Sequence, residues 1–503
     1  MKKCKKLISL LLALLMVFAL SSAAFAAEEA ERDMPIIYIP GFTSSNVYDD
    51  ISNPDTLVAY PSGEEILDIV TEAFIPALIG FSIDKDTDKL VTSVTDRVND
   101  AFAYWFNEPT GEAKEGSGIL PQELTDITAS SELTFSYDWR ADPMKIADEL
   151  HTYIEEVCRL SGCEQITLGC HSLGTTIALA YITKYGNDRV AGMVFDSPAC
   201  NGVSLVGNIF TGKVNLDADG LVSFIKALVG NNEYESFIAS FLYILSNAGV
   251  LNLFTDFADE IIEALAPAVY RETVIPLLGC WPTMWSMVPD NKMEEAKAYM
   301  LDEALAGMDL SELESKIDNY NNTVRANREQ TLRAFDEVGK FAIISRYTTQ
   351  TAPLKDYSYL LSDQIIETES TSFGATTAPI GEYFSDEYLE GKNPEYISPD
   401  KTVDASTCLF PEKTWFIKGS GHFETDGVTK EHYAVFLYAE EELTCDTAPL
   451  GRFTLRDDSY NIVEDTTNPE STKIPSFLES TFIFVKELLK VLADLLGKLF
   501  SEQ

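Results

Sequence analysis

The sequence predicts an α/β fold in which a mostly parallel, doubly wound sheet carries a large helical insertion. Three short apolar runs, at Met34 to Ile39, Gln165 to Leu168 and Val190 to Phe195, have the continuous hydrophobic character of strands that are buried on both faces. Helical periodicity separates these runs, as expected for a parallel sheet whose strands are joined by covering helices. From about Gly202 to Glu337 the helical pattern continues with almost no strand signal, which indicates an insertion between strands.

The remaining elements of the sheet follow from the same patterns. The first strand ends at Pro40-Gly41, a pair typical of a tight loop. A second strand is expected over Leu133 to Tyr137, and a helix over Met144 to Leu160, where apolar residues recur every three or four positions. Strands resume after the insertion at Phe341 to Ile344 and at Thr414 to Ile417.

The segment around Ser172 is the most informative part of the chain. His171-Ser172-Leu173 stands between an apolar run and a helix of small residues that begins at Gly174. A serine on a sharp strand-to-helix turn, with small residues two positions away on either side, is the nucleophile elbow of the α/β-hydrolase fold. Cys170 stands where the G-x-S-x-G pattern has its first glycine, and cysteine is small enough to fit. We therefore predict an α/β-hydrolase fold; the alternative is an ordinary turn with a polar residue.

The N-terminus has the pattern of a secretory signal peptide. Lysines at positions 2, 3, 5 and 6 precede an apolar stretch from Leu7 to Leu20, which is short for a membrane span, and Ala24-Phe25-Ala26 is a small-residue cleavage site. We therefore expect cleavage near Ala26 and a secreted, extracellular mature protein.

The composition limits which kinds of partner and cofactor are expected. The net charge of −43 argues against nucleic acid as a partner and against electrostatic attraction to anionic membranes. With four histidines, no C-x-x-C pair and no Cys/His cluster, we expect neither a metal site nor a cofactor.

The predicted organisation after residues 1–26 has five parts. Residues 27–201 and 339–455 form the two parts of the hydrolase core, and 202–338 form a helical cap or lid; the alternative is a helical domain without a role in the site. Its helix at Glu235 to Phe254 is more apolar than a surface helix needs. Residues 456–475 are acidic and contain proline, which is typical of a linker. Residues 476–503 form an amphipathic helix that either packs on the core or makes peripheral contact with a lipid surface, as the cap also could.

A serine nucleophile needs a histidine base and a carboxylate that orients this base. His151 lies inside a predicted helix, and His171 adjoins the serine on the wrong side of the turn. His432 stands in a charged segment and is expected to be solvated. His422 follows a predicted strand in a loop with two glycines, which is where the last member of the triad falls in this fold. His422 is therefore the predicted base.

Two aspartates satisfy the chain order serine, acid, histidine of this fold. Asp363 lies between the cap and His422, and Asp196 lies at the end of the strand that follows the elbow. We favour Asp363 as the acid and keep Asp196 as the alternative. The oxyanion of a tetrahedral intermediate needs two backbone donors, and the predicted donors are the N–H groups of Leu173 and of Phe42 in the glycine-bearing loop after the first strand.

Several of these segments resemble one family of lipid enzymes. Pro35 to Gly41, Tyr137-Asp-Trp-Arg140 and His171 to Gly174 are similar to three motifs of the lecithin:cholesterol acyltransferase and lysosomal phospholipase A group. Ser362 to Ser370 is similar to the segment that carries the acid in that family, and Trp415 followed by His422 is similar to its last catalytic stretch. The resemblance covers roughly residues 34–200 and 340–425. It implies Ser172 as nucleophile, Asp363 as acid, His422 as base, and Phe42 and Leu173 as oxyanion donors.

The sequence therefore predicts a secreted serine hydrolase or acyltransferase that acts on lipid esters through an acyl-enzyme at Ser172. One alternative is a carboxylesterase for small esters, or a peptidase, on the same fold. A second alternative from a different class is a non-catalytic binding protein that has kept the hydrolase fold. The departures from the resembling family, among them Cys170 and a long acidic stretch from Glu382 to Asp404, bear on substrate and acceptor more than on the acyl chemistry.

Overall fold

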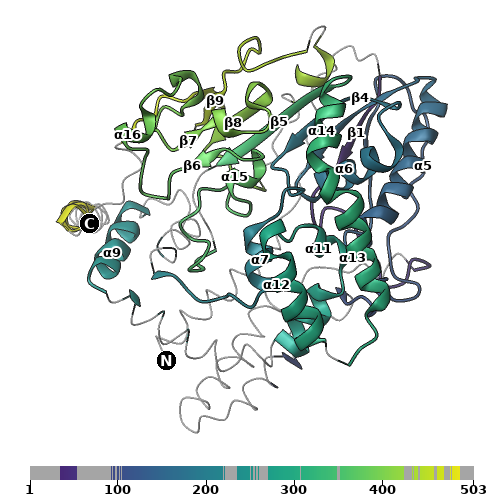
Figure 1. Cartoon of the computed structure of the whole chain (residues 1–503), viewed down its shortest axis with the longest axis horizontal. Helices are drawn as coiled ribbons and strands as arrows, with labels where there is room; N and C mark the ends of the chain where they lie inside the picture. The colour runs from purple at the N-terminus through teal and green to yellow at the C-terminus, as the bar shows by residue number, and fades with distance from the viewer. Residues whose placement is uncertain are drawn as a thin grey trace, which may run out of the picture.

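An eight-stranded sheet forms the centre of the computed structural model (Figure 1). The structure describes residues 34–53, 105–218, 235–249, 270–305, 307–347, 352–423, 435–439, 442–457, 461–469 and 478–487, with scattered positions between these ranges. The strands follow the order β10-β9-β8-β5-β4-β3-β1-β2. Every neighbouring pair is parallel except β9 and β10, which are antiparallel at one edge.

The strands of the two sheets are β1 (Ile36–Ile39), β2 (Glu132–Thr134), β3 (Ile166–His171), β4 (Val190–Asp196), β5 (Lys340–Tyr347), β6 (Thr376–Thr377), β7 (Val403–Asp404), β8 (Thr414–Lys418), β9 (Phe453–Arg456) and β10 (Ile462–Glu464). The α-helices are α5 (Pro143–Ser161), α6 (Leu173–Tyr185), α7 (Ser204–Phe210), α9 (Glu235–Asn247), α11 (Pro282–Ser286), α12 (Met293–Lys297), α13 (Ser311–Thr323), α14 (Arg328–Asp336), α15 (Thr368–Thr371) and α16 (Asp386–Leu389). Two π-helical segments, η3 (Tyr270–Gly279) and η5 (Ala298–Ala304), and five short 3₁₀ turns complete the elements: η4 (Asp290–Lys292), η6 (Arg325–Asn327), η7 (Pro394–Tyr396), η8 (Ala405–Thr407) and η9 (Pro411–Lys413).

The six strands expected from the sequence are present, the second of them at Glu132–Thr134 rather than up to Tyr137, and the α/β-hydrolase fold is confirmed. All six predicted strands lie in the large sheet, and β2 pairs with the outer side of β1 rather than with β3. Helix α5 begins where the Asp142 side chain accepts a hydrogen bond from the Met144 N–H at 2.9 Å, and it ends at Gly162 in the left-handed conformation.

Alternate residues of each central strand face two different cores, as the pleat of a strand requires. Ile37 and Ile343 belong to the larger core, which α5, α6 and α14 cover. Ile36 and Ile344 belong to a smaller core on the opposite face, where residues between 433 and 450 pack against them. Both faces of the sheet are therefore covered, which explains why its strands are apolar without interruption.

The described part of residues 202–338 is helical and carries no strand among its elements. The apolar helix that was expected to continue to Phe254 ends earlier, since α9 stops at Asn247 and Gly249 follows with a φ of 70°. Glycine at a positive φ terminates a helix without a steric penalty.

The expected linker over residues 456–475 is wrong in its first part. β9 ends at Arg456 and β10 lies inside the expected linker, where the two strands form the antiparallel edge of the sheet. The acidic, proline-containing composition of this segment gave no strand signal for these two short strands. Only later does the chain reach a helix, described over residues 478–487, which lies beside α9 with the Phe484 and Phe241 rings 5.7 Å apart (Figure 1).

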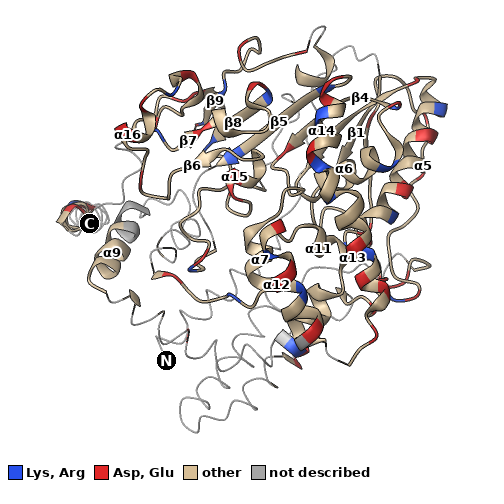
Figure 2. Cartoon of the chain, in the orientation of Figure 1, with Lys and Arg blue, Asp and Glu red and all other residues tan. Residues whose placement is uncertain are grey.

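Acidic residues are prominent on the outer helices α5, α13 and α16 (Figure 2). No helix in the described residues is both long and apolar enough to cross a membrane. The predicted signal peptide lies outside the described residues.

Candidate active site

Ser172 occupies the sharp turn between β3 and α6. Its backbone has φ 52° and ψ −123°, a conformation that is strained for a residue with a side chain and that costs about 1–3 kcal/mol. Gly174 makes the turn possible, since a Cβ there would lie 2.0 Å from the carbonyl oxygen of Ile39. Cys170, fully buried two residues before the serine, fits where glycine was expected.

Ser172, His422 and Asp363 form one chain of hydrogen bonds. The Ser172 Oγ lies 2.9 Å from His422 Nε2, and His422 Nδ1 lies 2.7 Å from Asp363 Oδ2. With the imidazole proton on Nδ1, His422 donates to the carboxylate and accepts from the serine hydroxyl. All three side chains are buried, with relative exposures of 6% for Ser172, 4% for His422 and 0% for Asp363. The structure thus brings together three residues from distant parts of the sequence.

The second carboxylate oxygen of Asp363 is held by the backbone. Oδ1 accepts hydrogen bonds from the N–H groups of Ile365 at 3.0 Å and Ile366 at 2.7 Å. Burial alone would raise the pKa of Asp363, but His422 and these two N–H donors more than offset it and hold the pKa below its usual range. The Asp363 carbonyl also accepts from the His422 N–H at 2.7 Å, so the acid segment fixes both the ring and the backbone of the histidine.

The loop after β1 lies directly against the serine. A Cβ on Gly41 would lie 2.8 Å from the Ser172 Cβ and 3.3 Å from its Oγ, so only glycine permits this approach. Phe42, the next residue, lines the cavity beside Ser172, and Leu173 follows the serine as the first residue of α6. Both predicted oxyanion donors are therefore at the elbow or in the loop that faces it.

The Tyr-Asp-Trp-Arg segment holds this loop in place. The Tyr137 hydroxyl donates to the Pro40 carbonyl at 2.6 Å, and the Trp139 indole N–H donates to the Ser45 carbonyl at 3.1 Å. The Trp139 ring also meets the Phe42 ring edge to face, with centroids 4.9 Å apart.

Asp196, the alternative acid, has a different partner. It lies at the end of β4, fully buried, and its carboxylate forms a two-pronged ion pair with Arg346, in which Arg346 Nε donates to Oδ1 at 2.8 Å. The Tyr433 hydroxyl donates to the same carboxylate at 2.6 Å. Burial opposes ionisation of Asp196, but the Arg346 charge outweighs it and keeps the pKa of Asp196 below its usual value. Sequence reasoning missed Arg346, although a lone arginine in the apolar run of β5 was a visible signal.

An apolar cavity of about 80 Å³ opens beside the Ser172 hydroxyl. Ser172 and His422 are among the residues that line it. An apolar part of the lining, the wall, comes from the insertion: Val203, Leu205, Val206 and Ile209 at α7, and Met284 and Met287 at α11. Glu367 ties this wall to the acid segment, since its carboxylate accepts from the Ser204 N–H at 3.0 Å.

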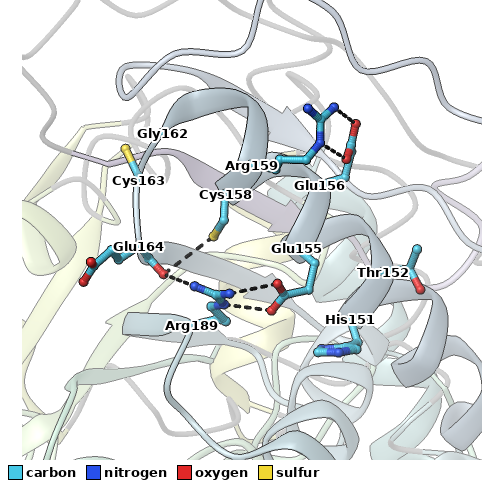
Figure 3. Close-up of a pocket in the computed structure, with 10 residues that line it drawn as sticks. All are labelled: His151, Thr152, Glu155, Glu156, Cys158, Arg159, Gly162, Cys163, Glu164 and Arg189. Atoms are coloured by element: carbon cyan, nitrogen blue, oxygen red, sulfur yellow. Dashed lines mark hydrogen bonds and ion pairs between the residues drawn. The ribbon is translucent and has the colours of Figure 1, made fainter.

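A larger hollow of about 780 Å³ lies elsewhere on the molecule, on α5 (Figure 3). It contains exposed ion pairs, with Arg159 bound to Glu156 and Arg189 bound to Glu155, and the hollow lies near the starts of β3 and β4 rather than their ends. In α/β sheets, ligands bind outside the carboxyl ends of the strands. The smaller cavity at Ser172 is therefore the candidate site.

The other histidines lie outside the hydrogen-bonded chain. His151 is in α5 and stacks on Tyr185 with ring centroids 3.9 Å apart. His171 packs against His422 at 4.9 Å and is mostly buried; its pKa is lowered to about 3, chiefly by burial. His432 lies outside the described residues.

One comparison with known proteins, a family model, agrees with the fold. Residues 128–234, which contain the elbow, match the alpha/beta hydrolase fold family model. A search of curated proteins found no match. Among solved structures, the chain is similar to a thermophilic esterase from Thermogutta terrifontis, with 11% identity over 68% of this chain and 78% of that one and a TM-score of 0.19. It is also similar to lipase 1 from Pelosinus fermentans, with 12% identity over 84% and 91% and a TM-score of 0.19.

A third similar structure is the Tle4-Tli4 complex, with 16% identity and a TM-score of 0.21. That match covers 35% of this chain and spans about half, 48%, of the matched chain.

Proposed function

We propose that this protein is a serine hydrolase that cleaves esters of apolar acyl groups, in particular lipid esters, through an acyl-enzyme on Ser172. The observation that carries the proposal is the buried hydrogen-bonded chain from Ser172 through His422 to Asp363, which opens onto an apolar cavity. A serine hydroxyl is a weak nucleophile until a base removes its proton, and this chain supplies the base and its orienting carboxylate.

In the first half of the reaction, the Ser172 Oγ attacks the ester carbonyl carbon while His422 Nε2 takes the hydroxyl proton. Asp363 stays ionised, because its low pKa favours the carboxylate, and it stabilises the imidazolium that forms. The N–H groups of Phe42 and Leu173 stabilise the negative oxygen of the tetrahedral intermediate. The intermediate collapses to an acyl-enzyme, and His422 returns the proton to the leaving alcohol.

In the second half, His422 accepts a proton from water as the water oxygen attacks the acyl-enzyme carbonyl. The tetrahedral intermediate then breaks its bond to Ser172 Oγ, His422 returns the proton to that oxygen, and the acid is released. An alcohol in place of water gives acyl transfer to a new ester by the same steps. Hydrolysis and transfer therefore differ only in which acceptor reaches the cavity.

The nature of the cavity wall favours a lipid acyl group over a small polar substrate. The part of the lining that the insertion supplies is formed by valine, leucine, isoleucine and methionine side chains. Each methylene group buried against such a surface is worth about 0.8 kcal/mol. A carboxylesterase for small esters and a peptidase remain the rivals within the same chemistry, and a binding protein without activity is the rival outside it.

The test begins with a fluorophosphonate probe on the full-length mature protein, followed by peptide mass spectrometry. We expect the probe on Ser172, and no label would overturn the hydrolase proposal in favour of a binding protein. A series of p-nitrophenyl esters from acetate to palmitate then measures kcat/KM against chain length. A maximum at acetate would reject lipid esters and favour the small-ester rival.

The proposal extends to secretion and to contact with a lipid surface. In the helix described over residues 478–487, Leu478, Phe482 and Val485 are 79%, 73% and 47% exposed, and their spacing places them on one side of the helix. Phe484 faces the other way, against Phe241 of α9. This combination suits a helix that is attached to the insertion on one side and offers apolar side chains to a lipid surface on the other.

Truncation after residue 475 tests the lipid-surface role without removing β9 and β10. We expect unchanged kcat/KM on p-nitrophenyl butyrate and lower activity on dispersed long-chain lipid esters. Equal loss on both substrates, accompanied by a lower melting temperature, would show that the helix only stabilises the core. Secretion is tested by expression with and without residues 1–26, with the protein expected in the medium only when these residues are present.

A further inference from the structure

A buried ion pair lies beneath the candidate site. Asp196 is the last residue of β4, and Arg346 lies one residue before the end of the neighbouring strand β5. Both side chains are fully buried. The Arg346 guanidinium binds the carboxylate with two nitrogens, Nε to Oδ1 at 2.8 Å and Nη2 to Oδ2.

The pair connects the two halves of the reaction centre. The backbone carbonyl of Asp196 accepts a hydrogen bond from the N–H of Ser172 at 3.0 Å. At the other end of the pair, Arg346 Nη1 donates to the carbonyl of Gly421 at 3.3 Å, and Gly421 is the residue immediately before His422. A path of backbone and side-chain hydrogen bonds therefore runs from the serine to the histidine loop, separate from the direct contact between their side chains.

Stability alone is a weak explanation for such a pair. Replacing a buried ion pair by apolar residues of similar size is often neutral or stabilising, because removing two charges from water is costly. The groups that face the pair are the Tyr433 hydroxyl, which donates to Asp196 at 2.6 Å, and His171, whose Nδ1 lies 3.8 Å from Asp196 Oδ2. Asp363 and His422 are the nearest groups of the reaction itself, and the positive charge of Arg346 also interacts with Asp363.

We infer that Arg346, held by Asp196, is a positioning residue for the base. The Arg346 guanidinium fixes the Gly421 carbonyl and thereby keeps His422 aligned between Asp363 and Ser172. This inference rests on the proposed function, since it assigns a role within the same site. A planar guanidinium can bind a carboxylate with two nitrogens and a carbonyl with the third, whereas a lysine ammonium acts as a single point charge.

The experiment compares Arg346→Lys and the neutral double variant Asp196→Asn/Arg346→Gln with the wild type. The double variant leaves no unpaired charge in the core, which keeps it folded. The readouts are the rate of fluorophosphonate labelling per folded molecule, with kcat and KM on p-nitrophenyl butyrate. A misplacement of about 1 Å at a reacting group costs about 10²-fold. We expect the labelling rate and kcat to fall by about that factor in both variants, with KM within about twofold of the wild type.

The matched control is Arg452→Lys. Arg452 is also buried, and its guanidinium also binds a carboxylate and a backbone carbonyl, Glu412 Oε2 at 3.2 Å and the carbonyl of Pro411, neither of which belongs to the candidate site. A lower melting temperature with an unchanged rate per folded molecule is expected for this control.

Three outcomes distinguish a failure of the positioning role from a failure of the proposed function. A wild-type rate in Arg346→Lys, or a loss that merely follows the folded fraction as in the Arg452→Lys control, overturns the positioning role alone. A wild type that the probe does not label overturns the proposed function and this inference with it. A fall in kcat at constant KM in both Arg346 variants, with full activity per folded Arg452→Lys molecule, supports the role.

Discussion

Two groups of residues at the candidate site, a polar floor and an apolar wall, differ in origin and in chemistry. The polar floor consists of Ser172, His422 and Asp363 with the Asp196–Arg346 pair beneath them, and its parts lie at strand ends and in the loops that follow them. The apolar wall consists of Val203, Leu205, Val206, Ile209, Met284 and Met287, which the insertion supplies. The floor is dense in hydrogen bonds that fix atoms relative to one another, and the wall is defined by shape and hydrophobicity. In the proposed function, the floor therefore determines whether an ester reacts, and the wall determines which ester is accepted.

The two buried aspartates show the same division on a smaller scale. Asp363 and Asp196 are both fully buried with lowered pKa values. Asp363 is paired with a histidine that accepts a proton during the proposed reaction, whereas Asp196 is paired with a permanent cation. The partner, rather than the burial, separates the proposed catalytic carboxylate from the supporting one.

Ser172→Ala should have the largest effect on the floor. Alanine fits the same turn, so the fold is retained while the nucleophile is lost, and removal of a triad serine typically lowers turnover by about 10⁶. Hydrolysis of p-nitrophenyl butyrate measures the effect, and circular dichroism checks the fold. Substantial turnover by a folded Ser172→Ala protein would mean that the floor is not the reaction centre.

Asp363→Asn should have the next largest effect and should separate the two aspartates. A wrong tautomer of the base lowers turnover by about 10⁴ in related triads. Asp196→Asn should instead leave Arg346 as an unpaired buried charge and lower the free energy of unfolding by about 3–5 kcal/mol, with a much smaller fall in turnover per folded molecule. Turnover and urea denaturation of both variants provide the comparison, and reversed results would assign the acid role to Asp196.

A smaller effect is expected from the wall, in Val206→Phe. The larger ring fills the cavity beside the serine, so long acyl chains lose their contacts, and each lost methylene contact costs about 0.8 kcal/mol, or about fourfold in kcat/KM. The preference should therefore shift to shorter esters while labelling of Ser172 is retained. Val214→Phe, the same change at a partly buried position of the insertion that does not line the cavity, is the control. An unchanged chain-length profile in Val206→Phe would exclude this wall as the acyl site.

The sequence predicted the floor better than the wall. The elbow depends on local sequence, since Gly174 and Ser172 occupy fixed places between a strand and a helix. His422 could be selected as the base because the chain has only four histidines to compare. The order of strands and the helix α5 also follow from local periodicity. The ambiguity between Asp363 and Asp196 could not be removed, because both satisfy the chain order and only three-dimensional contacts distinguish them.

What the sequence did not predict depends on long-range packing. The strands β9 and β10 are short and lie at the sheet edge, where little apolar surface marks them. The contact of Arg346 with the loop of His422 joins residues separated by 75 positions, and that separation leaves no local pattern. The wall was foreseen only as a cap of unspecified shape, because its residues are placed by the packing of α7 and α11 rather than by their own spacing.

The smallest expected effect concerns His171, the neighbour of His422 in the floor, and appears in stability rather than in turnover. Burial, with His422 and Arg346 adding to it and Asp196 opposing it, lowers the pKa of His171 to about 3 in the folded state, whereas an unfolded histidine has a pKa near 6.5. Between these values the unfolded chain binds a proton that the folded protein does not bind, so the folded state loses stability as the pH falls.

The loss of stability is at most about 1.4 kcal/mol per pH unit, and it is less here because the His171 side chain keeps 16% exposure. Asp363 and Asp196, whose pKa values lie below 3.8, contribute once the pH falls below about 5, where their carboxyl groups in the unfolded chain begin to bind protons, so the window that reports on His171 runs from pH 6.5 to about 5. His171→Phe retains an aromatic ring against His422 but cannot titrate, so its urea midpoint should fall less steeply than that of the wild type across this window. Equal slopes for the two proteins would mean that His171 also binds its proton in the folded protein. The lowered pKa of His171 beside Asp196 would then be wrong.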